Sequence, residues 1–335
     1  MSSPTNKKSS NFGRRLALTF VLLAWVAAVG LIAANRQNIL DWWKLRQYRP
    51  PAAVSALASQ DTMNAYGRKI FYVNHPSIEA KTAFAASCPK NGGEQTIVLG
   101  CYHPGESGIF LLSVNDQRLD GVEQVTAAHE MLHGAYERLS GPDRKRVDAM
   151  LLDYYNHDLH DQRILNTIAA YKRSEPHDVV NEMHSVFGTE VAQLPPGLET
   201  YYRRYFTNRA QIAAFAAQYQ AEFTSREDAL AQDDARLSAL KTQIDQDESD
   251  LQIKQNEIDV RQNQLLAQKN SGDVNGYNAG VPGYNNLVDA YNIEVQTVKD
   301  LVNQYNQLVV ARNAVALQEN QLVKALSTDV APIRH

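Results

Sequence analysis

The pattern of apolar and polar positions changes along the chain and divides it into five segments. After a short polar tail comes an unbroken apolar run, followed by a spacer and a mixed pattern of short elements. The last third of the chain repeats apolar residues at a seven-residue step. Each of these patterns is typical of a different kind of structure. The predicted parts are a tail (1–15), a membrane helix (16–34), a spacer (35–60), a globular domain (61–205) and a helical hairpin (206–330).

The apolar run predicts a membrane anchor. Residues 16–34 carry no charged side chain, and a helix of about 20 apolar residues spans the hydrocarbon core of a bilayer. The run is longer than the apolar part of a usual signal peptide, so we expect an uncleaved anchor, with a cleaved signal as the alternative. Arg14 and Arg15 favour a cytoplasmic N-terminus, although basic residues also follow the run. Trp42 and Trp43 would suit the outer interface.

Short elements follow from about residue 61. The segments 69–74 (KIFYVN), 95–102 (QTIVLGCY) and 108–114 (GIFLLSV) are rich in branched and aromatic residues, which predicts strands. Helical patterns occupy residues 120 to 205. Strands followed by helices predict the α+β class, here a short antiparallel sheet plus helices.

Residues 206–330 carry apolar side chains at heptad spacing, as in a coiled coil. A glycine-containing break at 271–283 separates two arms, so an antiparallel hairpin that closes on itself or recruits another chain is expected. The first arm has the seam Phe223, Leu230, Leu237, Ile244, Leu251, Ile258 and Leu265; the second has Tyr284, Val288, Tyr291, Val295, Val298, Val302, Tyr305 and Val309.

Charge and cysteine content limit the classes of function. The net charge of −4 gives no electrostatic case for binding nucleic acid, so no nucleic-acid partner is expected. The only cysteines, Cys88 and Cys101, lie close in sequence and could form a disulfide if this part of the chain is outside the cytoplasm. Closing such a loop would stabilise the fold by about 3 kcal/mol. Two buried free thiols are the alternative.

The stretch AAHEMLHGA (127–135) carries the candidate chemistry. Asp120 followed by Glu123 predicts a capped helix start, so His129 and His133 would lie one helical turn apart and could converge on one metal ion. Zinc accepts neutral imidazole and prefers four ligands, with one position open at a catalytic site. Glu130 points about 100° away round the helix, where it could activate a water molecule instead of binding the ion.

His129-Glu130-Met131-Leu132-His133 resembles the HExxH motif of zinc metallopeptidases. The resemblance implies a zincin-like domain in which His129 and His133 bind Zn²⁺ and Glu130 is the general base. It also implies that GIFLLSV is the edge strand that binds an extended peptide.

A third zinc ligand is expected downstream. Asn181-Glu182-Met183-His184-Ser185 is similar to the segment that supplies a glutamate ligand in gluzincins, and its helix is expected to start near Ser174. Glu182 is the first choice for the third ligand. Val186 stands where gluzincins often carry an acid, which leaves Glu190 and His184 as alternatives.

An oxyanion stabiliser is also expected. Candidates are Tyr201, Tyr202, Arg203 and Tyr205, but amphipathic packing explains these residues equally well.

The resulting hypothesis is a membrane-anchored zinc metallopeptidase that hydrolyses a peptide or protein substrate outside the cytoplasm. An alternative is an envelope scaffold that acts through its coiled coil and carries an inactive or structural zincin-like domain. Hydrolysis of another carbonyl, such as one in a cell-wall peptide, is a third reading.

Overall fold

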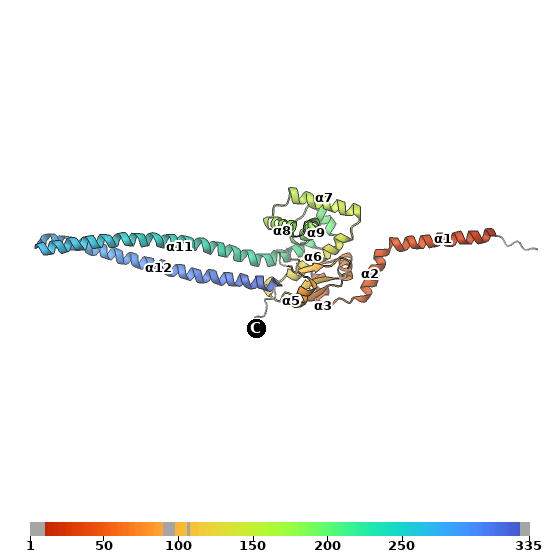
Figure 1. Ribbon diagram of the computed structural model, residues 1–335, viewed down its shortest axis with the longest axis horizontal. Helices are drawn as coiled ribbons and strands as arrows, with labels where there is room; N and C mark the ends of the chain where they lie inside the picture. Colours follow the sequence, from red (N-terminus) through yellow and green to blue (C-terminus); the bar gives the residue numbers. More distant parts are fainter. Residues whose placement is uncertain (1–10, 90–97, 106–107, 329–335) are drawn as a thin grey trace, which may run out of the picture. The chain divides into compact units, whose positions relative to one another are not determined.

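A computed structural model describes residues 11–89, 98–105 and 108–328 (Figure 1). The described residues of Met1–Ser113, Gly121–Ala216 and Thr328–His335 form one compact unit. Val114–Asp120 and Ala217–Ser327 form the other. The fold is mostly helical with a small sheet, and the expected apolar N-terminal helix and long C-terminal helical hairpin are both present.

Helix α1 (Asn11–Ala34) contains the apolar run. Among the described residues, Leu16–Ala34 is the one helical segment long and apolar enough to cross a membrane, with a mean hydropathy of 2.5 and none of the window buried. A segment of this kind near the N-terminus could be a membrane anchor or a signal sequence.

Residues 35–60, expected as a spacer, contain two helices that pack in the first unit. Helix α2 (Arg36–Gln47) buries Asp41 and contacts α4 (Ala65–Val73), while α3 (Ala52–Gln60) contacts the helix that carries the histidine motif. The expected strand at 69–74 is wrong, because these residues lie in α4 and the turn that ends it. Asn64 caps α4 by accepting hydrogen bonds from the backbone of Tyr66 and Gly67.

The sheet of the described residues has three strands in the order β1-β3-β2, formed by Ser77–Glu79 (β1), Gly100–Tyr102 (β2) and Ile109–Leu112 (β3). Strand β3 pairs parallel with β1 and antiparallel with β2, so the expected antiparallel sheet is in fact mixed. The segment 108–114 does contain a strand, but β3 is central and β2 is an edge. Of the expected strand 95–102, residues 95–97 lie outside the described part.

Helices fill the rest of the first unit, as expected for residues 120–205. The histidine motif lies on α6. The residue at the N-cap of this helix is Gly121, one position after the expected Asp120. Gly121 has φ +105°, and a Cβ there would lie 2.8 Å from the Phe215 carbonyl oxygen, so the position requires glycine. The helix that carries Glu182, α9, starts at Val179 and not near Ser174, which is the last residue of α8. The bounds in this unit are α5 Lys81–Ser87, α6 Val122–Glu137, α7 Gly141–His157, α8 Gln162–Ser174, α9 Val179–Glu190 and α10 Pro196–Tyr202. The short helix η1, Gln117–Leu119, belongs to the other unit.

Cys88 and Cys101 form a disulfide. The bond joins the residue after α5 to the edge strand β2. It therefore ties β2 covalently to the body of the first unit.

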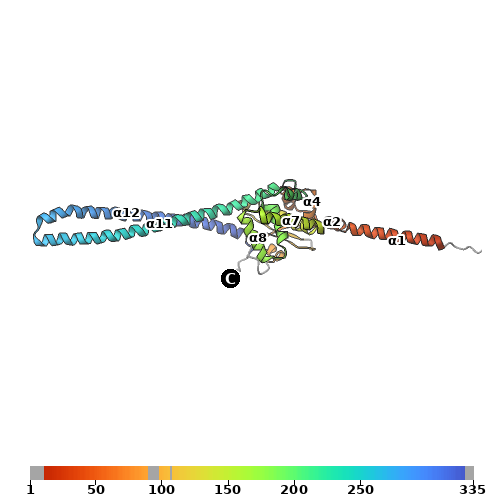
Figure 2. The ribbon, with the colours of Figure 1, turned by 90° about the horizontal axis from the view of Figure 1, so that it is seen from above.

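Helices α11 (Arg209–Ser271) and α12 (Val274–Leu326) form the hairpin (Figure 2). Ion pairs cross it between Asp234 and Arg312 and between Lys254 and Glu294, so residue numbers rise on one helix as they fall on the other. The expected break at 271–283 is much shorter, because only Gly272 and Asp273 interrupt the helices. All the predicted seam positions are partly or fully buried.

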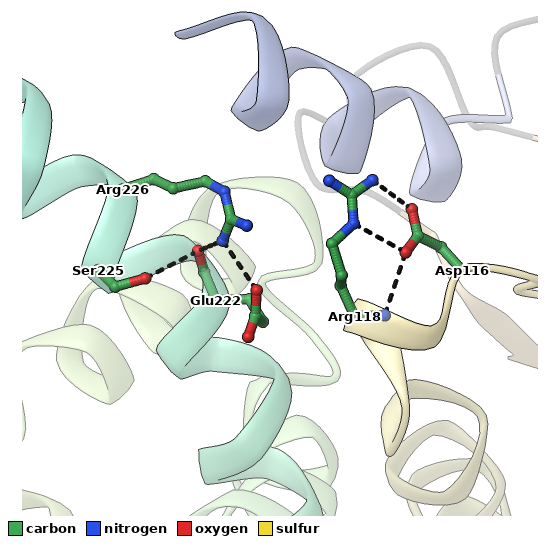
Figure 3. Close-up of polar contacts among 5 residues, drawn as sticks. All are labelled: Asp116, Arg118, Glu222, Ser225 and Arg226. Atoms are coloured by element: carbon green, nitrogen blue, oxygen red, sulfur yellow. Dashed lines mark hydrogen bonds and ion pairs between the residues drawn. The ribbon is translucent and has the colours of Figure 1, made fainter. Parts of the chain in front are cut away.

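The segment Val114–Asp120 belongs to the same unit as the hairpin. Asp116 caps η1 and pairs with Arg118 at 2.6 Å, while Arg226 on α11 pairs with Glu222 at 2.9 Å (Figure 3). The pKa of Asp116 lies below its ordinary value, chiefly because of Arg118 and to a smaller extent because of Arg226. The segment and α11 thus present complementary charges to each other.

Candidate metal centre

Helices α6 and α9 bring three candidate ligands together. His129 and His133 stand one turn apart on α6, and their ring centroids are 4.8 Å apart. Glu182 on α9 faces both rings: its Oε2 is 3.5 Å from His129 Nε2, and its Oε1 is 3.4 Å from His133 Nε2. The three ligand atoms lie within 4.8 Å of one another, so the group could hold a metal ion.

Small residues let the two helices approach closely. A Cβ on Gly188 of α9 would lie 2.5 Å from Leu132 Cδ1 on α6 and 2.8 Å from a ring carbon of Tyr202. A side chain at this position would therefore press directly on the helix that carries the histidines. Glycine at 188 thus helps set the separation between Glu182 and the two imidazoles.

Glu130 lies outside this ligand group, against the edge strand. A Cβ on Gly100 of β2 would lie 2.7 Å from Glu130 Oε1 and 2.6 Å from Thr126 Cγ2. Burial raises the pKa of Glu130 to about 7, with Glu182 also raising it and His133 opposing. A carboxyl with such a pKa can both accept and return a proton near neutral pH.

The donor set fits a divalent metal ion. Two imidazole nitrogens and one carboxylate are ligands that zinc accepts, and three protein ligands leave a coordination position open. None of the described residues donates a hydrogen bond of normal geometry to Glu182 Oε2, although this atom is buried. Burial would raise the pKa of Glu182, but the nearby His133 and His129 outweigh it and lower the pKa, which favours the ionised form that a metal requires.

The two alternative third ligands point elsewhere. Glu190 pairs with Arg163 on α8, with 2.6 Å between Oε2 and Nη1. His184 is fully buried, its Nε2 lies 2.8 Å from the Tyr201 hydroxyl, and burial lowers its pKa to about 3. A neutral histidine inside a tyrosine cluster is a packing residue rather than a ligand.

The same cluster accounts for the tyrosines considered as oxyanion stabilisers. The Tyr202 hydroxyl donates to the His184 carbonyl at 2.7 Å, and the hydroxyls of Tyr201 and Tyr205 are 3.1 Å apart. All three side chains are buried, so their hydroxyls stabilise the interior behind α9. The histidines at 157, 160 and 177 are exposed.

Two residues near the site were not identified from the sequence. Tyr171 on α8 interacts with the Glu182 carboxylate and lowers its pKa. Gly100 leaves room for Glu130 beside β2. A tyrosine and a glycine in those sequence contexts carry no pattern that separates them from packing or turn residues.

Comparisons of the chain with protein-family models, with curated proteins and with solved structures found no match in any of the three.

Proposed function

We propose that this chain is a membrane-anchored zinc metallopeptidase. The observation that carries the proposal is that a His129–His133–Glu182 group, in which His133 and Glu182 are buried and His129 is half-buried, lies beside a separate buried carboxylate, Glu130. A purely structural metal site would have no use for the second carboxylate.

The residues would divide the work of hydrolysis as follows. His129, His133 and Glu182 would hold the zinc ion, which when bound polarises a carbonyl and lowers the pKa of a water molecule to about 7. Glu130 would take a proton from the attacking water and pass it to the leaving amine. Strand β2 lies at the sheet edge beside Glu130, so its outer backbone groups are suited to pairing with an extended peptide.

The other parts of the chain would place this chemistry in the cell. Residues 16–34 would anchor the protein with its N-terminus in the cytoplasm. The catalytic domain (61–205) would lie outside, where a disulfide between Cys88 and Cys101 persists. The hairpin (206–330) would serve as a partner-binding or self-association arm.

Metal content and peptide hydrolysis of the purified full-length protein test the proposal. We expect about one zinc per chain in the wild type and in Glu130→Gln, with hydrolysis lost in Glu130→Gln. His133→Ala should lose the metal. A wild-type protein that binds no zinc would overturn the proposal.

Matched variants test the third ligand. Glu182→Gln should weaken zinc binding strongly, whereas Glu190→Gln and His184→Phe should keep the metal because their side chains bond to Arg163 and Tyr201. A loss of zinc confined to Glu190→Gln would contradict the assignment.

The scaffold reading is the outcome if zinc is bound but no peptide is hydrolysed. In that case Glu130→Gln would change nothing, while deletion of the hairpin would abolish the cellular role. Hydrolysis of a cell-wall peptide but not of ordinary peptides would keep the mechanism and change the substrate.

A further inference from the structure

One face of helix α2 packs against the rest of the first unit. Its Asp41 is 1% exposed and pairs with Lys69 of α4 at 2.9 Å. Both Asp41 oxygens also accept hydrogen bonds from Arg138, at 2.9 and 3.0 Å. Further along, the Tyr48 hydroxyl donates to the Pro76 carbonyl at 2.6 Å. These bonds hold α2 against the body of the unit in a fixed rotation about its axis.

The opposite face of α2 presents apolar side chains to solvent. Successive helical residues are rotated by about 100°, so Ile39 and Trp43 lie roughly opposite Asp41, with Leu40 and Trp42 on either flank. Their exposed fractions are 47% for Ile39, 44% for Leu40, 56% for Trp42 and 60% for Trp43. Exposing two adjacent tryptophans on a helix is unfavourable in water, which indicates that another phase or molecule covers this face.

Basic residues accompany the apolar ones. Arg36 and Arg46 lie on the same outer face, and the Arg46 guanidinium stacks over the Trp42 ring at 4.7 Å from its centroid. Aromatic and aliphatic side chains flanked by arginines are typical of helices that lie in the interface of an anionic membrane. Tryptophan and arginine are also enriched at protein interfaces, so the place of α2 in the chain decides between the two kinds of partner.

The position of α2 in the chain points to the same partner. Only Asn35 separates it from α1, which contains the apolar segment long enough to span a bilayer. A helix that follows a membrane span after one residue begins within the headgroup region.

We propose that α2 is an interfacial helix whose outer face, formed by Ile39, Leu40, Trp42 and Trp43, lies in the headgroup region of an anionic membrane. The inference does not depend on the chemistry proposed for the metal centre. It has a consequence for substrates, because Arg138 directly follows α6 and lies only about 7.5 Å along the helix from His133. The docked membrane would hold the metal centre near its surface, which favours substrate segments close to the membrane.

The three tryptophans of the chain provide the test. Full-length Trp25→Phe, in which Trp42 and Trp43 are the only tryptophans, is reconstituted into vesicles of phosphatidylcholine and phosphatidylglycerol. Lipids brominated near the headgroup end or near the chain end quench tryptophans at different depths. We expect quenching at least about twofold stronger by the shallow bromines, as for interfacial aromatic side chains.

The matched control is Trp42→Phe/Trp43→Phe, which retains only Trp25 in the middle of the apolar segment. Its fluorescence should be quenched more by the deep bromines, and this control reports separately on whether α1 spans the bilayer. Trp42 and Trp43 that neither lipid quenches would overturn the proposal, and shielding from aqueous iodide in that case would indicate a protein partner. Stronger quenching of Trp42 and Trp43 by the deep bromines would also overturn it.

Charge reversal tests the need for an anionic surface. Arg36→Glu/Arg46→Glu in the Trp25→Phe background leaves Asp41 and its bonds unchanged. Each basic residue near an anionic surface favours the bound state by roughly fivefold, so shallow quenching should fall and approach the value in pure phosphatidylcholine. Equal quenching in both lipids and in both variants would contradict the charge requirement that the proposal includes.

Discussion

Asp41 is expected to make one of the largest single contributions to the stability of the first unit. We consider Asp41→Asn, which keeps the shape of the side chain and removes its charge. The substitution leaves Arg138 and Lys69 next to each other without their shared anion. It also replaces one of the two oxygens that accept hydrogen bonds from Arg138 by an NH2 group, which cannot accept, and leaves the other as a neutral amide oxygen.

The size of the loss follows from the burial of the partners. Removing one member of a buried ion pair costs about 3–5 kcal/mol. The side chains of Arg138 and Lys69 are 15% and 31% exposed, so they can regain part of their hydration in the variant. We therefore expect a loss of about 2–3 kcal/mol in the free energy of unfolding, just below that range. For a unit of this size the midpoint of thermal unfolding should fall by about 5–10 °C.

Fluorescence of Trp42 and Trp43 in the Trp25→Phe background reports on unfolding next to the substituted residue. Asp153→Asn is the matched control, because Asp153 pairs with His157 on the surface, where both side chains are about 70% exposed. It should have no measurable effect. A double-mutant cycle with Arg138→Ala should give a coupling energy of at least about 1.5 kcal/mol. A midpoint for Asp41→Asn equal to that of the control would refute the reasoning.

Three further predictions concern Asp41, Gly188 and Gly100. Burial would raise the pKa of Asp41, but Arg138 and Lys69 outweigh it and hold the pKa below its ordinary value of 3.8. The stabilisation by Asp41 should therefore be complete above about pH 5 and be lost as the pH falls below about 4. The difference in unfolding free energy between wild type and Asp41→Asn should shrink over that range. Gly188→Ala should weaken zinc affinity by pushing α9 from α6, whereas Gly141→Ala, with no described atom within 4 Å of the new Cβ, should not. Gly100→Ala should displace the Glu130 carboxylate, so peptide hydrolysis should fall about 10-fold or more while zinc content stays constant; unchanged hydrolysis would contradict the placement of Glu130 beside β2.

The local parts of the site were accessible from the sequence. His129 and His133 are one turn apart on a single helix, so their convergence requires only that the helix form. Glu182 was accessible only through a resemblance, because its position depends on how α9 packs against α6. The Asp41–Arg138 bond joins residues 97 positions apart and left no trace in any periodicity.

The errors in secondary structure arise where packing against other elements overrides a local sequence pattern. The short apolar stretch at 69–74 fits a strand or a buried helix equally well, and the cap at Asn64 and packing of Ile70 and Phe71 made it a helix. The glycine-containing stretch 271–283 was read as one long turn. In the structure only Gly272 takes a positive φ, 76°, and the partner helix supports the remaining residues as part of α12.

The segment Val114–Asp120 has a consequence for how the protein can be dissected. It connects β3 to α6, two elements of the first unit, yet it groups with α11 and α12. No single cut in the chain therefore separates the two units. A fragment that ends near residue 205 would lack Glu222 and Arg226, and Asp116 and Arg118 would face water in their place (Figure 3). Within the hairpin, changes in length are best tolerated near Gly272, which lies between α11 and α12.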